Sequence, residues 1–299
     1  MIFNKFREGK VTKNYYYFNS ISDLSQYIED NKNKIEKSGI SYSTTSHGND
    51  PENRGQYSWH GSMTFKEAFD KLVNGDIDLA NKIEDIDIGN KVDVEKIAQK
   101  YVNDIVGVIP HVPNSIIGVP QSMIDIRRTR VRTNNKIIDL IIDSSVHCGI
   151  TAEDYIRVSK LFLNIVDKIE KIGYRCNIYY SITNYDDYYR TYYNNWLLKL
   201  KGSEEPFNKY KCAFVIGSLA MFRRIGFRLI ELGDSSRADK GEYGCLAANK
   251  TTINLINDNH KISMILSKNP KIIRLYDMLN ETEESVIKNI VDINQNEHR

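Results

Sequence analysis

Residues 136–182 constrain the fold more than any other part of the chain. The run "KIIDLIID" at 136–143 is short and rich in Ile, which is typical of a buried strand. The segment 151–173 follows with apolar residues at helical spacing and Thr151 as a candidate N-cap, and "YRCNIYYSI" at 174–182 is the next strand candidate. Strand, helix and strand in this order predict a βαβ unit with parallel strands and a right-handed crossover. We therefore expect an α/β fold with a partly parallel sheet.

The rest of the chain predicts an added helical region before this core. A chain of 299 residues with 41% hydrophobic and 27% charged residues has a globular composition. Thr64 and Glu67 form a capping-box pattern ahead of an amphipathic helix, and the acidic stretch 76–105 has the pattern of a helical hairpin. We expect an N-terminal α+β or helical extension over 1–108 and an α/β core domain over 109–299.

Charge and cysteine usage exclude several classes of protein. The net charge of +2 gives no global field that would attract DNA or an anionic membrane. The start of the chain lacks the apolar region of a signal peptide, and no apolar run reaches the 18 residues of a membrane span. We therefore expect a cytoplasmic protein without membrane contact. The four cysteines form no C-x-x-C pair, so buried free thiols are expected.

One candidate metal site follows the first strand of the βαβ unit. Asp143, Ser145 and His147 lie at alternating positions where a strand ends, which is where open α/β sheets bind ligands. A carboxylate and a hydroxyl at this spacing suit Mg²⁺, whereas imidazole prefers Zn²⁺ or Fe²⁺. The alternative is that Asp143 and Ser145 only cap the turn into the helix. No other cofactor is expected, because the sequence has no G-x-G-x-x-G, G-K-[ST] or H-E-x-x-H motif.

A segment with three prolines and several arginines, residues 110–132, suggests a nucleic-acid contact. The prolines predict a stiff, extended segment that cannot form a recognition helix. In the strand expected to follow, Arg128, Arg130 and Arg132 would share one face and could grip phosphates. The alternative is an edge strand protected by charge against aggregation.

An aromatic stretch, "YDDYYRTYYNNW", supplies candidate residues for binding a protein partner. Exposed aromatic residues with an arginine among them have the composition of interface hot spots. We expect a protein partner to bind through residues of this stretch. We also expect the chain to form homo-oligomers. The candidates are Tyr189, Arg190, Tyr192, Tyr193 and Trp196.

Three segments together resemble a family of uncharacterised proteins of tailed bacteriophages and prophages. The patterns are W-x-G-S, V-P-x-x-x-x-G-x-P-x-x-M and M-x-R-R-x-G-F, spread over 57–231. They fall on Trp59, Gly61 and Ser62, on Val112, Pro113, Gly118, Pro120 and Met123, and on Met221, Arg223, Arg224, Gly226 and Phe227. This resemblance implies a phage accessory protein in the host cytoplasm that acts by binding another protein, for example by blocking a host antiviral defence complex such as Gabija.

Residues 136–182 are also similar to von Willebrand A-like domains. This similarity covers the βαβ pattern and the D-x-S-x-H spacing. It implies a metal-binding adaptor as an alternative to a non-enzymatic binding protein. A phage virion or DNA-processing component is the other alternative, and it belongs with the phage resemblance.

Overall fold

The computed structural model describes most of the chain, which divides into two compact units. The large unit comprises 1–90 and 136–299, and the small unit comprises 91–135. This division differs from the expected boundary between residues 108 and 109. The described residues are 1–8, 11–32, 59–83, 97–130, 136–146, 149–171, 173–185, 192–233, 265–266 and 270–291.

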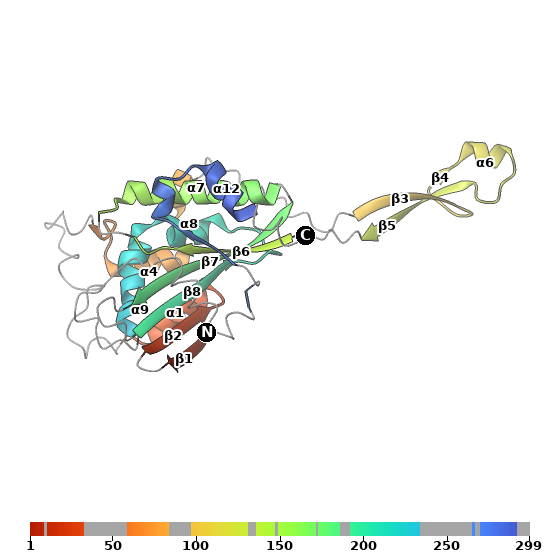
Figure 1. Ribbon diagram of the computed structural model, residues 1–299. Helices are drawn as coiled ribbons and strands as arrows, with labels where there is room; N and C mark the ends of the chain where they lie inside the picture. Colours follow the sequence, from red (N-terminus) through yellow and green to blue (C-terminus); the bar gives the residue numbers. More distant parts are fainter. Residues whose placement is uncertain are drawn as a thin grey trace. The chain divides into compact units, whose positions relative to one another are not determined.

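The large unit contains a six-stranded mixed sheet in the order β1-β2-β8-β7-β6-β9 (Figure 1). The strand bounds are β1 Ile2–Glu8, β2 Val11–Phe18, β6 Lys136–Asp143, β7 Tyr174–Tyr185, β8 Tyr192–Lys201 and β9 Lys271–Arg274. Strand β6 pairs in parallel with β7 and with β9, and β2 pairs in parallel with β8. The other two pairs, β1 with β2 and β7 with β8, are antiparallel. The predicted α/β class with a partly parallel sheet is confirmed, and the first two strands of the chain belong to the same sheet as the core.

The predicted βαβ unit is present as β6, α7 (Ala152–Lys171) and β7. Helix α7 begins where expected, because the Thr151 hydroxyl accepts a hydrogen bond from the Asp154 amide at 3.1 Å. The helix stops before Gly173, whose φ of 101° lies in the left-handed region. Strands β7 and β9 lie on opposite sides of β6. The strand order therefore reverses at β6, and we call this place the reversal point of the sheet. In open α/β sheets, ligands bind at the carboxyl ends of the strands beside such a point.

The remaining helices of the large unit cover one face of this sheet. Residues from these helices and from one face of the strands form a single buried cluster. The opposite face carries a smaller cluster that includes Tyr17, Tyr179 and Leu266. Figure 1 shows α12 beside α7, with α8 also near α7. The bounds are α1 Ile21–Asp30, α4 Phe65–Asn74, α5 Ile77–Ile83, α8 Lys209–Gly217, the π-helix η2 Met221–Gly226, α9 Phe227–Leu232, the short 3-10 helix η4 Asp277–Leu279 and α12 Glu283–Val291.

The predicted capping box at the start of α4 is confirmed. The Thr64 side chain accepts from the Glu67 amide at 3.2 Å, and the Glu67 carboxylate accepts from the Thr64 amide at 2.8 Å. The hydrogen bonds from Thr64, its amide first and then its hydroxyl, hold the pKa of Glu67 below its ordinary value. Two donors at the helix start are thereby satisfied from within the chain.

Two of the three segments that suggest the phage family meet inside the large unit. The Arg223 guanidinium lies 4.3 Å from the centre of the Trp59 ring and donates to the Trp59 carbonyl oxygen at 2.5 Å and to the Ile150 carbonyl oxygen at 3.3 Å. Arg224 donates to the Met63 carbonyl oxygen at 2.9 Å. Both arginines are buried in η2. They therefore hold the loop before α4 against the helical layer, in agreement with a structural role for arginines in an apolar helix.

The small unit is a three-stranded antiparallel sheet with one short helix. Its strands lie in the order β3-β5-β4, with bounds β3 Ile97–Asp104, β4 Ile109–Pro110 and β5 Met123–Arg130, and its helix is α6 Val112–Ile116. Two expectations are wrong here. The end of the acidic stretch forms a strand and not a helix, because β3 pairs along its whole length with β5. The proline segment contains a one-turn helix, since a proline near a helix start needs no amide donor.

Candidate interaction site

One face of the small unit's sheet is apolar and has no core to cover it. The backbone register pairs Tyr101 with Ile126 and pairs Asn103 and Ile109 with Ile124, so these residues share a face. Tyr101 is 63% exposed and Ile109 is 46% exposed. Antiparallel sheets normally bury one face against a core. In the small unit this face is open.

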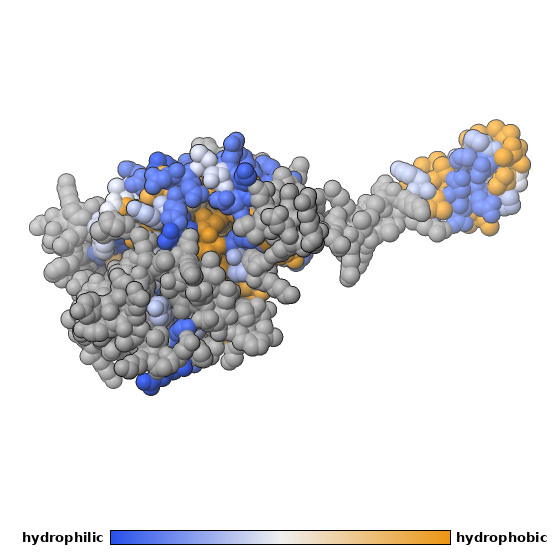
Figure 2. Space-filling view, in the orientation of Figure 1, coloured by the Kyte–Doolittle hydropathy of each residue, from blue (hydrophilic) through white to orange (hydrophobic). Residues whose placement is uncertain are grey.

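The end of the small unit that carries α6 adds a second group of exposed aliphatic side chains. Figure 2 shows apolar residues gathered over this end. Among residues 101–126, all of which the structure describes, none is buried. We call residues 105–124 the tip, and its exposed large apolar residues are Ile105, Val106, Val108, Ile109, Val112, Ile116 and Ile117. Clusters of exposed large apolar side chains often mark sites of interaction.

The tip is held in shape by its own hydrogen bonds. The His111 ring nitrogen Nδ1 accepts from the Asn114 amide at 3.3 Å and so caps α6, and the His111 amide donates to the Ser122 carbonyl oxygen at 2.7 Å. The Asn114 side-chain amide donates to the Gln121 carbonyl oxygen at 2.9 Å. At Gly107, a Cβ atom would lie 2.5 Å from the Ile124 carbonyl oxygen, so only glycine fits there. An ordered loop loses less conformational entropy on binding than a flexible one.

Charge is distributed unevenly along the small unit. The tip carries no Asp, Glu, Lys or Arg over twenty residues. The whole unit, 91–135, has seven Lys and Arg against four Asp and Glu, and four of its arginines lie within 127–132. The candidate nucleic-acid residues Arg128 and Arg130 belong to β5, as the predicted strand requires, whereas Arg132 lies outside the described residues.

The candidate metal residues lie at the carboxyl end of β6, beside the reversal point of the sheet. Asp143 and Ser145 are fully buried. The Asp143 Oδ1 atom accepts from the Ser145 amide at 3.0 Å, and the Ser145 hydroxyl is 3.5 Å from the Thr183 carbonyl oxygen. His147, the third candidate ligand, lies outside the described residues. Within the described part of the chain, no group of three or more His, Cys, Asp or Glu could hold a metal ion. The hydrogen bond between Asp143 and Ser145 is the one expected of a turn-capping role.

The aromatic candidates for partner binding are not all at the surface. Trp196 is 2% exposed, and its ring stacks on that of Tyr16 with centroids 5.4 Å apart. Its expected exposure is therefore wrong, because strand β2 brings Tyr16 alongside it. Tyr193 is half-buried against the smaller core cluster, and Tyr192 begins β8. Tyr189 and Arg190 lie outside the described residues.

The two described cysteines have no nucleophilic character. Cys176 and Cys212 are free and buried. Burial raises the pKa of each thiol to about 12, so both stay protonated at neutral pH. The expected buried free thiols are confirmed for these two positions.

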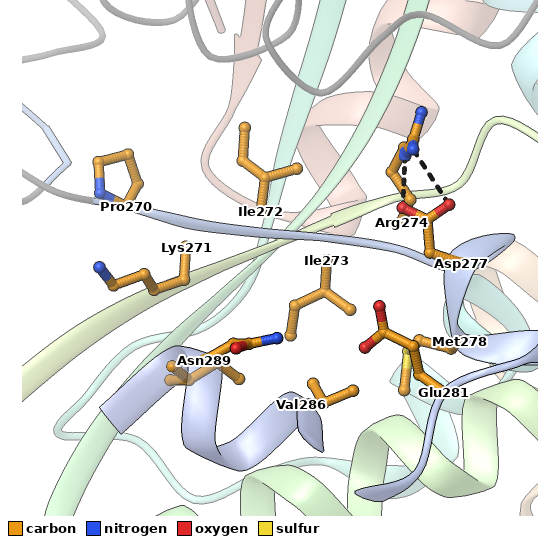
Figure 3. A pocket seen from close by; sticks show the side chains of 11 residues that line it. Pro270, Lys271, Ile272, Ile273, Arg274, Asp277, Met278, Glu281, Val286 and Asn289 are labelled. Atoms are coloured by element: carbon orange, nitrogen blue, oxygen red, sulfur yellow. Dashed lines mark hydrogen bonds and ion pairs between the residues drawn. The ribbon is translucent and has the colours of Figure 1, made fainter. Parts of the chain in front are cut away.

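The large unit has a cavity of about 350 Å³ between β9 and α12. Figure 3 shows the side chains of Ile273, Met278 and Val286 pointing toward one another along it. At one end Arg274 donates to both carboxylate oxygens of Asp277, at 2.8 and 3.0 Å, and Glu281 also lines the cavity. An apolar floor with a charged rim suits a small amphipathic molecule or a side chain of a partner.

Comparison with known proteins places the chain in a family without assigning a function to it. The family model described as "Domain of unknown function (DUF7192)" matches residues 7–290. The chain belongs to the DUF7192 family. No curated protein and no solved structure matches it. Family membership therefore adds no catalytic or binding residues to those derived from the structure.

The exposed apolar tip, 105–124, is not among the candidate sites expected from the sequence. The signal is present as the uncharged run 105–124, but the prolines in that run favour the interpretation of a stiff connecting segment.

None of the helices in the described part of the chain is both long enough and apolar enough to cross a membrane.

Proposed function

We propose that this chain is a non-enzymatic protein that acts by binding another protein through the apolar surface of its small unit. The observation that carries this proposal is the ordered apolar tip without any buried residue. An isolated two-stranded hairpin is marginally stable at best in water, and the third strand of this sheet, β4, has only two residues. A partner that covers the tip would both stabilise it and gain binding free energy.

The size of the available driving force supports binding. Full burial of a Val or Ile side chain contributes about 1.5 to 3 kcal/mol. Three or four of the exposed tip residues would therefore offset a large part of the cost of association, which is at least about 4 kcal/mol. Val106, at 79% exposed, and Ile116, at 78%, have the most surface to bury.

The cellular role that we propose is that of a bacteriophage accessory protein acting on a partner in the host cytoplasm. The resemblance in the three sequence segments supports this role. A purified host defence complex such as Gabija is the first candidate partner to test. The alternative role of a metal-binding adaptor rests on Asp143, Ser145 and His147 and predicts retention of a divalent ion that Asp143→Ala abolishes.

The test compares three full-length proteins in cells by affinity purification and quantitative mass spectrometry. They are the unchanged chain, the double variant Val106→Asp/Ile116→Asp, and the control Ile77→Asp, which changes a 63% exposed residue of the large unit. We expect a partner that the unchanged chain and the control retain and that the double variant loses by about 100-fold, because burying unpaired carboxylates costs several kcal/mol. Equal recovery by all three proteins would refute the proposal.

A further inference from the structure

We propose that the partner's site for the small unit is an aliphatic surface bordered by carboxylates. This inference rests on the protein-binding role proposed above and adds the chemistry of the partner. Two observations carry it: the tip, 105–124, has no charged residue, and the following part of strand β5 carries Arg127, Arg128 and Arg130 against one carboxylate, Asp125. The partner must be apolar where it meets the tip and acidic beside that contact.

The apolar and basic regions lie on one continuous strand, so a single partner surface can meet both. Strand β5 runs from Met123 to Arg130 and pairs with β3 over all eight positions. At about 3.3 Å per residue, Ile124 and Arg128 are about 13 Å apart along the strand. That separation is shorter than a protein interface of ordinary size, which has an apolar centre and a polar rim.

A second copy of the same surface fits this pattern poorly. In a two-fold interface, if one region of a copy contacts a second region of its partner, then that second region of the copy also contacts the first region of the partner. Full antiparallel overlap would place the arginine end of each copy against the uncharged tip of the other. The arginines would then lose water without gaining a carboxylate, which is unfavourable. A tip-to-tip contact would leave the apolar sheet face around Tyr101 uncovered.

Nucleic acid and lipid are also poor occupants. A phosphate backbone can pair with arginines but cannot cover aliphatic side chains such as Val106 and Ile116. A bilayer could cover those side chains, but irregular backbone is not tolerated in contact with lipid tails. Within 105–124 the tip has a two-residue strand, a five-residue helix and the first two residues of β5, and the rest of its backbone is irregular.

The test measures binding of two synthetic amphipathic helical peptides to the full-length chain by fluorescence anisotropy. Both peptides carry the same Leu and Ile face, and its borders are Glu in one and Lys in the other. We expect the Glu-bordered peptide to bind at least about tenfold more tightly at low salt, with the ratio falling as salt screens the charges. Arg128→Glu/Arg130→Glu should remove or reverse this preference, and the control Ile77→Asp should keep it.

The outcomes separate this inference from the proposed function. If both peptides bind equally and Val106→Asp/Ile116→Asp abolishes binding, the small unit binds proteins but the acidic border is wrong. If neither peptide binds at concentrations up to about 1 mM, the inferred partner chemistry is wrong, and the protein-binding role is then decided by the affinity purification. Binding of phosphatidylserine vesicles or of DNA in place of the peptides would overturn both the inferred partner chemistry and the protein-binding role, and self-association lost in the double variant would identify a second copy as the occupant.

Discussion

Replacing Arg223 by Met should destabilise the large unit strongly while keeping its volume. The arginine is 1% exposed, donates to the carbonyl oxygens of Trp59 and Ile150, and lies over the Trp59 ring. Each charged hydrogen bond contributes about 1.5 to 3 kcal/mol, and the cation–π contact about 0.5 to 2 kcal/mol. Burial of the Met side chain restores about 1.5 to 3 kcal/mol. The midpoints of these ranges give an expected loss of roughly 3.5 kcal/mol in the free energy of unfolding.

Urea titration followed by tryptophan fluorescence measures this loss, because Trp59 reports directly on the site. The matched control is Arg157→Met, which removes a guanidinium that is 65% exposed and 3.4 Å from Asp154. Exposed ion pairs contribute little, so the control should change the free energy of unfolding by less than about 0.5 kcal/mol. A loss below about 1 kcal/mol for Arg223→Met would show that the buried guanidinium does not hold the Trp59 loop in place.

Three further perturbations test other parts of the structure. Thr64→Ala should cost about 1 kcal/mol of stability at neutral pH. The pKa of Glu67 is lowered in the folded state, so the carboxylate stabilises the fold above its ordinary pKa, and this stabilisation is lost as pH falls through the folded pKa. The difference in melting temperature between the unchanged protein and Thr64→Ala should therefore shrink at decreasing pH. Cys176 and Cys212 should resist Ellman's reagent at about pH 8 in the native protein and react fully in guanidinium, since a thiol with a pKa of about 12 is almost entirely protonated; fast native reaction at both would contradict their burial. Gly107→Ala should speed amide hydrogen exchange in the small unit, because the added methyl group would lie 2.5 Å from a strand carbonyl oxygen. The melting temperature of the large unit should not change. Unchanged hydrogen exchange would mean that the tip tolerates a side chain at this position.

The parts of the fold that depend on neighbouring residues are predictable from the sequence. The βαβ unit is identifiable because its buried strands are continuous apolar runs and its helix has a period of 3.6 residues. The capping box is also identifiable, because its two partners, Thr64 and Glu67, lie within one helical turn of each other in the sequence. Local patterns determine such features without help from the rest of the chain.

The parts that depend on distant pairing are not predictable in this way. In β3 the apolar residues Ile97, Ala98, Tyr101 and Val102 have a spacing that also fits a helix, and only pairing with β5 makes the segment a strand. The polar sequence around Trp196 predicts a surface position, but Tyr16, 180 residues earlier in the chain, stacks on its ring. In each of these contacts, the sequence around one residue does not indicate which distant residue it will meet.

The two candidate sites also differ in how far the sequence predicts them. The sequence alone places Asp143 and Ser145 at the end of a core strand, because the strand and its end are local features. The exposure of the apolar tip is not predictable from the sequence, because an apolar run is normally expected to be buried. Its exposure follows from the small unit having too few elements to enclose a core.

Photo-crosslinking from position 106 is the most direct test of the proposed binding surface. A photoreactive amino acid replaces Val106 in the full-length chain, and the same residue at position 77 serves as the control on the large unit. We predict a covalent adduct with one identified protein from position 106, none from position 77, and loss of the reconstituted complex with Val106→Asp/Ile116→Asp. Adducts that form equally from both positions, or no protein adduct from position 106, would contradict a protein-binding role for the small unit.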